Sequence, residues 1–361
     1  MFRNSKAHQD SKVNKTDSVF YFNANIYNDP TPPQSAKIAR FNQSISSGSV
    51  VDLPENYYLA IVRFAISHML IPLYLFKDNF YSVTLRFGGV DYPEFLTYQT
   101  SGNFSQYGYN QPVFFYRQFV DMLNNALDLV NAALPGPQQS LIPPFIVYDE
   151  IEERFTLSLP ASYSPDANDI GVYFNANLYQ QIQLVSSVFQ GYNQPNGRDY
   201  LITNGIVPNT LPVGTVPFNQ VTLVAAGPAN VPFLTSTQER SALYLLNEVQ
   251  SIVFTSTSIN VTKEFIGKND GQGNVGSLSI IADFVPDQSS GRDLSEYQYN
   301  VQGPPRLVNL TNTIPITEID YQVGIRFRDG TIVPLYLEPG ETCEVKFGFF
   351  KKSLYDNSFE Y

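Results

Sequence analysis

The chain has few of the side chains that most metal sites and many catalytic sites require. Its 361 residues include one cysteine, two histidines and no tryptophan. Because Cys343 is alone, no disulfide can form within the chain, which fits folding in a reducing compartment. Zinc sites need clustered cysteine and histidine, and the sequence contains no such cluster. We therefore predict neither a disulfide framework nor a metal site.

The scarcity of histidine also limits nucleophilic catalysis. His8 lies in a polar N-terminal stretch, so a Ser-His-Asp or Cys-His arrangement would have to use His68, which lies in an apolar run. No Gly-x-Ser-x-Gly elbow accompanies His68, and we interpret it as a hydrogen-bonded, partly buried residue. The run Gly271–Gly276 matches a Gly-x-Gly-x-x-Gly pattern, but no predicted helix follows it, so it indicates a loop. The sequence predicts no catalytic residue, no cofactor-binding residue and no cofactor, and hence a protein that is not an enzyme.

Positive charge is scarce as well. Lysine and arginine total 22 against 33 acidic residues, which gives a net charge of −11. A protein that binds nucleic acid through phosphates usually has a basic face, so we predict no specific nucleic-acid partner. Residues 1–17 form the one basic stretch and are predicted to be a flexible arm. This arm is either solvated or ordered against a neighbouring subunit.

Long hydrophobic runs are also missing. The most apolar window, Tyr57 to Phe76, contains Arg63, His68 and Pro72 and alternates in its first half. We interpret it as a strand followed by an apolar connection, so no membrane span is predicted. The N-terminus is polar throughout, and no signal peptide is expected.

Aromatic residues and turn formers are abundant, with 24 Tyr, 27 Phe, 25 Pro and 22 Gly. Aromatic side chains suit strands, while proline and glycine mark turns, so a mainly β protein is predicted. Alternation is clearest over Glu318 to Arg328, where a two-residue Asp-Gly turn follows. The other predicted strands are residues 19–27, 36–45, 58–67, 80–87, 145–148, 154–159, 245–261, 277–285, 332–337 and 343–349, and 172–179 is a strand or a short helix.

One helix is predicted, over Pro112 to Leu134. Apolar residues recur there at helical spacing, and Pro135-Gly136-Pro137 stops the pattern. The acidic run Asp149 to Glu153 is interpreted as a solvated turn. Residues 186–240 carry proline or glycine every few positions and are expected to be irregular.

The regular strands fall into two blocks that flank a segment of different texture. The simplest account is an antiparallel jelly-roll sandwich, built from residues 18–87 and 241–352, with roughly four strands from each block. Residues 88–240 would be an inserted outer domain containing the helix, and residues 353–361 a C-terminal tail. An echo of Tyr21–Tyr27 (YFNANIY) at Tyr173–Tyr179 (YFNANLY) leaves a second possibility, two tandem sandwiches.

The C-terminal block resembles the penton, or minor capsid, proteins of polinton-like viruses and virophages. Segments of the central part are also similar: Asn124-Asn125, Pro144 to Asp149 and Val172 to Asn175. The C-terminal segments that carry the resemblance are 251–256, 261–265, 283–287, 305–307, 329–330, 334–335 and 345–352.

The resemblance implies a single jelly roll with an inserted outer domain, forming homopentamers at the five-fold axes of an icosahedral capsid. The implied partners are further copies of the chain and the major capsid protein, and the implied location is the virion, assembled inside the host cell. The inserted domain could also bind a host receptor. Three alternatives remain at this point: a trimeric, double-jelly-roll major capsid protein; a receptor- or glycan-binding spike; and a hydrolase that uses two of the 33 acidic residues.

Overall fold

The chain divides into two compact units. The computed structural model describes residues 19–31, 35–44, 46, 48–67, 71–100, 111–149, 151–164, 168–183, 185–203, 208–211, 231–241, 246–267, 275–286, 296–300 and 305–355. Unit 1 is Met1–Ile71 with Val249–Tyr361, and unit 2 is Pro72–Glu248. The predicted boundaries at 87/88 and 240/241 are thereby corrected to 71/72 and 248/249. The predicted arm, residues 1–17, lies outside the described residues.

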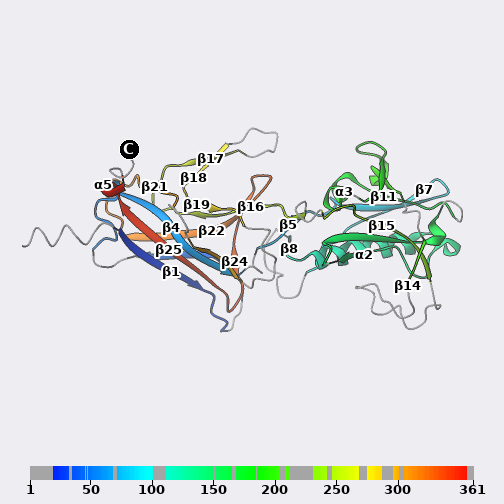
Figure 1. Ribbon diagram of the computed structural model, residues 1–361, viewed down its shortest axis with the longest axis horizontal. Coiled ribbons are helices and arrows are strands. Elements are labelled where there is room, and N and C mark those ends of the chain that lie inside the picture. The colour runs from blue at the N-terminus through cyan, green and yellow to red at the C-terminus, as the bar shows by residue number, and fades with distance from the viewer. Residues whose placement is uncertain are drawn as a thin grey trace, which may run out of the picture. The chain divides into compact units, whose positions relative to one another are not determined.

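Unit 1 is built from two antiparallel sheets (Figure 1). One sheet has the order β1-β25-β4-β20, and β21 also pairs with β4. The other has the order β19-β16-β22, and both β3 and β23 pair with the second edge of β22. These strands are β1 (Val19–Tyr27), β3 (Arg40–Ser44), β4 (Tyr57–Ser67), β16 (Val249–Thr255), β19 (Ile280–Phe284), β20 (Glu296–Asn300), β21 (Val308–Asn309), β22 (Glu318–Phe327), β23 (Ile332–Pro334) and β25 (Thr342–Lys351).

The strand order identifies the architecture of unit 1. We number its strands along the chain, counting β20 with β21 as one strand and leaving out the short β23. The two sheets then read 1-8-3-6 and 2-7-4-5. Successive strands thus repeatedly cross from one sheet to the other, as in a jelly roll. The predicted fold class is confirmed.

Alternating burial explains why these sequences form the sandwich. In β1, Ala24 is buried, whereas Tyr21, Asn23, Asn25 and Tyr27 on the opposite face are exposed. Phe20 stacks on Phe349 of β25 with ring centroids 4.7 Å apart. Between the two sheets, Tyr321 of β22 meets Phe347 of β25 at 5.2 Å. The aromatic residues that favoured strands in the sequence therefore fill the space between the layers.

One strand predicted for the sandwich, residues 80–87, belongs to unit 2. The segment predicted as the fourth jelly-roll strand, residues 80–87, is β6 (Ser82–Phe87), which pairs with β7 and β11 of unit 2. The N-terminal block therefore supplies three strands of the jelly roll, and β20 with β21 supplies the missing one. Two small ribbons complete unit 1: β2 (Lys37–Ile38) with β24 (Tyr336–Leu337), and β17 (Glu264–Gly267) with β18 (Val275–Leu278).

Unit 2 places a helix between two antiparallel sheets. α2 (Tyr116–Ala133) packs against β6 and β7 of one sheet and β9 of the other. The sheets have the orders β12-β13-β11-β6-β7 and β14-β15-β10-β9, and β5 pairs with β8. The strands are β5 (Tyr74–Phe76), β7 (Val90–Phe95), β8 (Gln111–Val113), β9 (Phe145–Asp149), β10 (Arg154–Pro160), β11 (Gly171–Phe174), β12 (Ser187–Phe189), β13 (Tyr200–Ile202), β14 (Pro208–Leu211) and β15 (Val231–Thr237).

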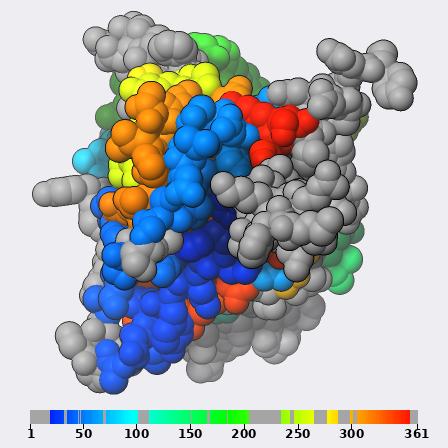
Figure 2. Space-filling model, turned by 90° about the vertical axis from the view of Figure 1, so that its left-hand side faces the viewer, coloured from blue at the N-terminus to red at the C-terminus, as the bar shows by residue number. Residues whose placement is uncertain are grey.

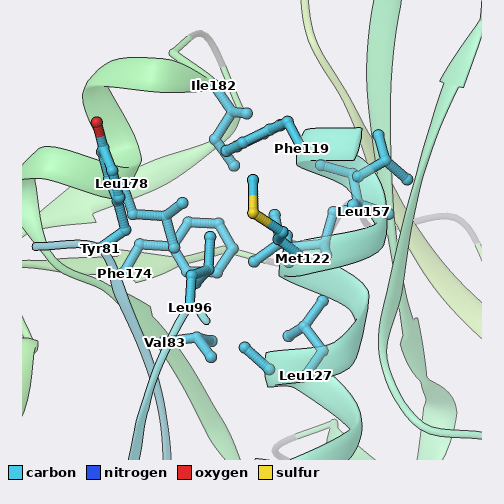
Figure 3. Packing of buried hydrophobic residues seen from close by; sticks show 14 of the residues in the cluster. Tyr81, Val83, Leu96, Phe119, Met122, Leu127, Leu157, Phe174, Leu178 and Ile182 are labelled. Carbon is cyan, nitrogen blue, oxygen red and sulfur yellow. The ribbon is translucent and has the colours of Figure 1, made fainter. Parts of the chain in front are cut away.

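The core of unit 2 forms around the apolar face of α2 (Figure 3). Phe119 and Met122 of the helix are fully buried and lie near Phe174 and Leu178. The predicted helical periodicity is therefore confirmed, but the predicted start at Pro112 is wrong. Pro112 lies in β8, opposite Leu75 of β5, so pairing between these strands delays the helix until Tyr116.

Several shorter elements were only partly anticipated. Residues 172–179, predicted as a strand or a short helix, contain both, because β11 is followed by the helix α3 (Ala176–Gln181). Asn175 caps α3, since its side chain accepts a hydrogen bond from the backbone N–H of Leu178. Within residues 186–240, which were expected to be irregular, four strands form: β12, β13, β14 and β15. The remaining short helices are η1 (Pro54–Asn56), η3 (Gly136–Gln138), η4 (Ala161–Tyr163), η5 (Pro195–Gly197) and α5 (Lys352–Tyr355).

Candidate assembly surfaces

Polar clusters in the described part of the chain are structural in character. No group of three or more His, Cys, Asp or Glu side chains gathers there as a metal site would require. His8 and His68 both lie outside the described residues. Cys343 is fully buried in β25, and this burial, together with the nearby Glu344, raises the pKa of its thiol to about 12. Such a thiol is not a nucleophile at neutral pH.

The most elaborate polar cluster surrounds Asp320 on β22. Its carboxylate accepts hydrogen bonds from the hydroxyls of Ser256, Thr257 and Ser258, at 2.5, 2.6 and 2.5 Å. Backbone N–H groups of Thr257 and Ser258 also donate to it. Burial alone would raise the pKa of Asp320, but these donors outweigh it and hold the pKa well below its usual range. The carboxylate therefore ties the loop after β16 to β22 and is not available as a general base.

A second cluster joins three segments that carry the family resemblance. The guanidinium of Arg306 donates to both Glu264 of β17 and Asp283 of β19. Arg306 comes just before β21, so its pair with Asp283 links the edges of both sheets of unit 1, and its pair with Glu264 attaches the β17–β18 ribbon. Its side chain is 45% exposed, which limits the contribution of the pairs to stability. The three segments are recognisable from the sequence by their resemblance to the family, but no local pattern predicts that they lie together.

The starts of β1 and β4 and the end of β25 lie at the same end of unit 1. The register pairs Val19, the start of β1, with Phe350, and Tyr57, the start of β4, with Lys351. The short helix α5 follows at this end, and Figure 2 shows it in red at the surface beside the blue N-terminal segments. The described part of the chain therefore begins, at Val19, and ends, at Tyr355, at the same end of the jelly roll.

The same end exposes apolar side chains. Leu53 is 56% exposed and Ile314 is 70% exposed. They lie two residues from Val51 and Ile316, which form an antiparallel bridge. Leu53 and Ile314 therefore add apolar surface at the end of unit 1 where the described chain begins and ends. The residues of the predicted C-terminal tail that the structure describes, 353–355, belong to α5.

Unit 2 carries an exposed aromatic cluster at its β12 edge. Phe189 and Tyr192 are 48% and 66% exposed, and their ring centroids are 4.8 Å apart. Tyr200 lies 5.0 Å from Phe189 and stacks on Tyr179 at 4.0 Å. The buried carboxylate of Asp199 accepts hydrogen bonds from the backbone N–H groups of Gln194 and Ala176, and these bonds fix the adjoining loop. The cluster is thus a preformed apolar surface.

The acidic run at the β9–β10 turn is a solvated turn, as predicted. Asp149 accepts hydrogen bonds from the backbone N–H groups of Ile151 and Glu152, and these bonds lower the pKa of its carboxyl.

Among the helices that the structure describes, none combines the length and apolar character that crossing a bilayer requires.

Comparison with known proteins agrees with this architecture. Residues 20–352 match the family described as Sputnik minor capsid protein V18/19. Structural protein V19 of Sputnik virophage is 28% identical over 213 residues, which cover 57% of this chain and 94% of that protein. A chain in the cryo-EM structure of Sputnik virophage is 25% identical, with a TM-score of 0.72 over 94% of this chain and 99% of that chain.

The fold also occurs in the mavirus penton protein. Its crystal structure superposes with a TM-score of 0.62 over 92% of this chain and 99% of that chain, at 14% identity. This likeness concerns the fold, whereas the family match spans nearly all of both units. The resemblance seen in the sequence is thereby confirmed, and with it the expected location in the virion. The chain belongs to the Sputnik minor capsid protein V18/19 family and is a structural protein of the viral capsid.

Proposed function

We propose that the chain is the penton subunit, which forms homopentamers at the five-fold axes of an icosahedral capsid and contacts the major capsid protein there. The observation that carries the proposal is the single jelly roll of unit 1, interrupted by unit 2 between its third and fourth strands. The full-length fold shared with a penton protein supports it. Five copies about one axis require a heterologous, ring-closing interface.

The proposed role requires no catalysis. No residue is assigned a catalytic, cofactor-binding or metal-binding role, and the Asp320 and Arg306 clusters are fully accounted for as structural ties. We propose unit 2 as the outer domain of the penton. The N-terminal arm and the C-terminal tail would pack on neighbouring subunits, because the described chain begins at Val19 and ends at Tyr355 at the end of unit 1 that exposes Leu53 and Ile314.

The mass of the purified assembly tests the proposal. Native mass spectrometry should find a species of five times 40.6 kDa. A stable trimer would instead favour a major capsid protein and would refute the penton assignment. Deleting residues 354–361 should reduce incorporation into capsids while leaving both units folded. Unchanged incorporation of this truncated chain would show that the tail makes no essential contact.

The aromatic cluster of unit 2 favours one additional role, attachment to a host receptor or glycan. Tyrosine and phenylalanine rings offer rigid apolar area at low entropic cost, and Phe189 and Tyr192 present it at the surface. The double substitution Phe189→Ser with Tyr192→Ser should abolish binding of the full chain to a glycan array or to host cells. Loss of binding without loss of assembly would assign attachment to unit 2, and the absence of any wild-type binding would remove this role.

A further inference from the structure

One side of the jelly roll leaves the edges of both sheets open. We call it the β1/β3 flank and define it as Val19–Tyr27 with Lys37–Ser44. Within the described residues, β1 pairs only with β25, and β3 pairs only with β22. β1 is nine residues long and contains neither a charged residue nor a proline. Natural edge strands usually carry such residues as protection against pairing with another chain, and β1 lacks them.

The apolar interior is also incompletely covered along this flank. Phe20, Phe22 and Ile26 point toward the core but are only half-buried, whereas their partners Phe349, Phe347 and Cys343 on β25 are fully buried. Phe41 of β3 is likewise half-buried and lies 5.9 Å from Phe22, so the two sheets meet here in a partly exposed aromatic seam. A partner packed on the flank would remove this apolar surface from water.

The β1/β3 flank carries two basic side chains, and two carboxylates lie on the opposite side of the jelly roll. Lys37 and Arg40 are exposed, and neither forms an ion pair with a described acidic residue, although Lys37 lies close enough to Asp29 to help lower the pKa of that carboxyl. On the opposite side, which we call the β19/β21 flank, Glu264 and Asp283 share the single guanidinium of Arg306. The exposed Lys263 adjoins Glu264, so the described charges of this flank balance, but the two carboxylates share one guanidinium and retain acceptor capacity for a cation of another copy.

We propose that the β1/β3 flank of one copy packs against the β19/β21 flank of the next copy and that this contact closes the ring. The inference rests on the proposed homopentamer and names the surfaces that build it. Because the two flanks are different surfaces on opposite sides of unit 1, their contact is heterologous and can repeat around a cyclic axis. The charge pairs set the orientation, and the aromatic seam provides the apolar area.

A double charge reversal on the full-length chain tests the inference. Lys37→Glu with Arg40→Glu places negative charge opposite Glu264 and Asp283 of the next copy, and both substituted side chains are exposed, so folding should be retained. The matched control, Lys77→Glu with Arg117→Glu, makes the same charge change on exposed residues of unit 2. We expect the flank variant to raise the concentration for half-assembly about tenfold or more, as like charges placed across an interface do. The control should assemble like the wild type.

Three outcomes are informative. Loss of the pentamer in the flank variant alone, in mass photometry at equal concentration, supports the assignment. Amide exchange should then slow in β1 and β3 when the wild type assembles and remain fast in the variant. Equal assembly of the flank variant, the control and the wild type would overturn the flank assignment while leaving the pentamer intact. A wild-type chain that never forms pentamers would overturn the proposed function and this inference together.

Discussion

Replacing Asn124 with alanine should destabilise unit 2 far more than the same change one residue later. Asn124 lies on the buried face of α2, where its side-chain oxygen accepts the N–H of Ile146 at 2.7 Å and its amide group donates to the Ile146 carbonyl at 2.9 Å. Ile146 is on β9, which pairs only with β10 among the described strands. The asparagine side chain thus satisfies the free edge of β9, as a further strand would.

The cost follows from the two backbone groups that the substitution leaves unpaired. Ile146 is fully buried, so water cannot replace the lost partner without opening the core. A buried donor or acceptor left unsatisfied costs about 1–3 kcal/mol, and for the two groups together we expect a loss of about 2–4 kcal/mol. Asn125 is exposed, and alanine there should be neutral or should stabilise α2 by up to about 0.7 kcal/mol through helix propensity.

Hydrogen exchange can measure both variants within unit 2. Amides of α2 and β9 should exchange about 30-fold to 1,000-fold faster in Asn124→Ala, which corresponds to the expected loss at 1.4 kcal/mol per tenfold. Peptides from β22 and β25 in unit 1 provide the internal reference. If Asn124→Ala and Asn125→Ala exchange at the same rate, the amide does not hold β9 to the helix and the reasoning is wrong.

Three further predictions concern unit 1. Asp320→Asn should destabilise it by about 1–3 kcal/mol at pH 7, because hydroxyl and backbone donors lose a charged acceptor. The folded-state pKa of Asp320 is lowered, so its contribution is present above the unfolded pKa of about 4 and is lost as the pH falls below it. Acid unfolding followed by circular dichroism should therefore be less steep in Asp320→Asn, and an unchanged profile would contradict this role. Gly348→Ala should lower the free energy of unfolding by about 1–3 kcal/mol, because an added Cβ would lie 2.6 Å from the buried Phe350 ring. The control Gly136→Ala places its Cβ where nothing lies within 4 Å, and its thermal melt should match that of the wild type. Cys343 is fully buried with a raised thiol pKa, so it should react with a thiol reagent only when unit 1 opens, and rapid labelling of the native protein would show that β25 is not held in the core.

The elements whose side chains alternate strictly were predictable from the sequence. β1 has the bounds expected for residues 19–27, and β22 matches the alternation predicted from Glu318 onward. In both strands one face is apolar and the other is polar, so the period of two is visible locally. The turn after β22 was predicted at the right place but with the wrong length. The N–H of Gly330 donates to the Phe327 carbonyl and the N–H of Phe327 donates to the Thr331 carbonyl, so the loop has three residues, and Gly330 alone takes a positive φ, +82°.

Pairing between distant segments was not predictable in the same way. A strand was correctly predicted within residues 80–87, but its partners Val90–Phe95 and Gly171–Phe174 place it in unit 2. β20 and β21 complete the sheet beside β4 but were not predicted: Glu296–Asn300 alternates polar and aromatic residues over only five positions, and β21 has two residues. Local pattern reports which face is buried, but not which strand lies alongside.

The repeated heptapeptide shows how context decides local structure. Tyr21–Tyr27 is strand β1 throughout, whereas Tyr173–Tyr179 ends β11 at Phe174 and continues as α3. In the second copy Asn175 caps the helix, and Asp199 accepts the N–H of Ala176. The first copy lies in the jelly roll and the second in unit 2, so the echo does not mark tandem sandwiches. The structural ties through Asp320 and Arg306 were also missed, because each joins segments that are far apart along the chain.

Imaging of the purified assembly tests the central claim most directly. Class averages of negatively stained particles should show closed rings with five-fold symmetry, because one jelly roll per subunit with two complementary flanks permits cyclic closure. Rings with three-fold symmetry, or single particles at every concentration, would contradict the account of this chain as a pentameric vertex protein.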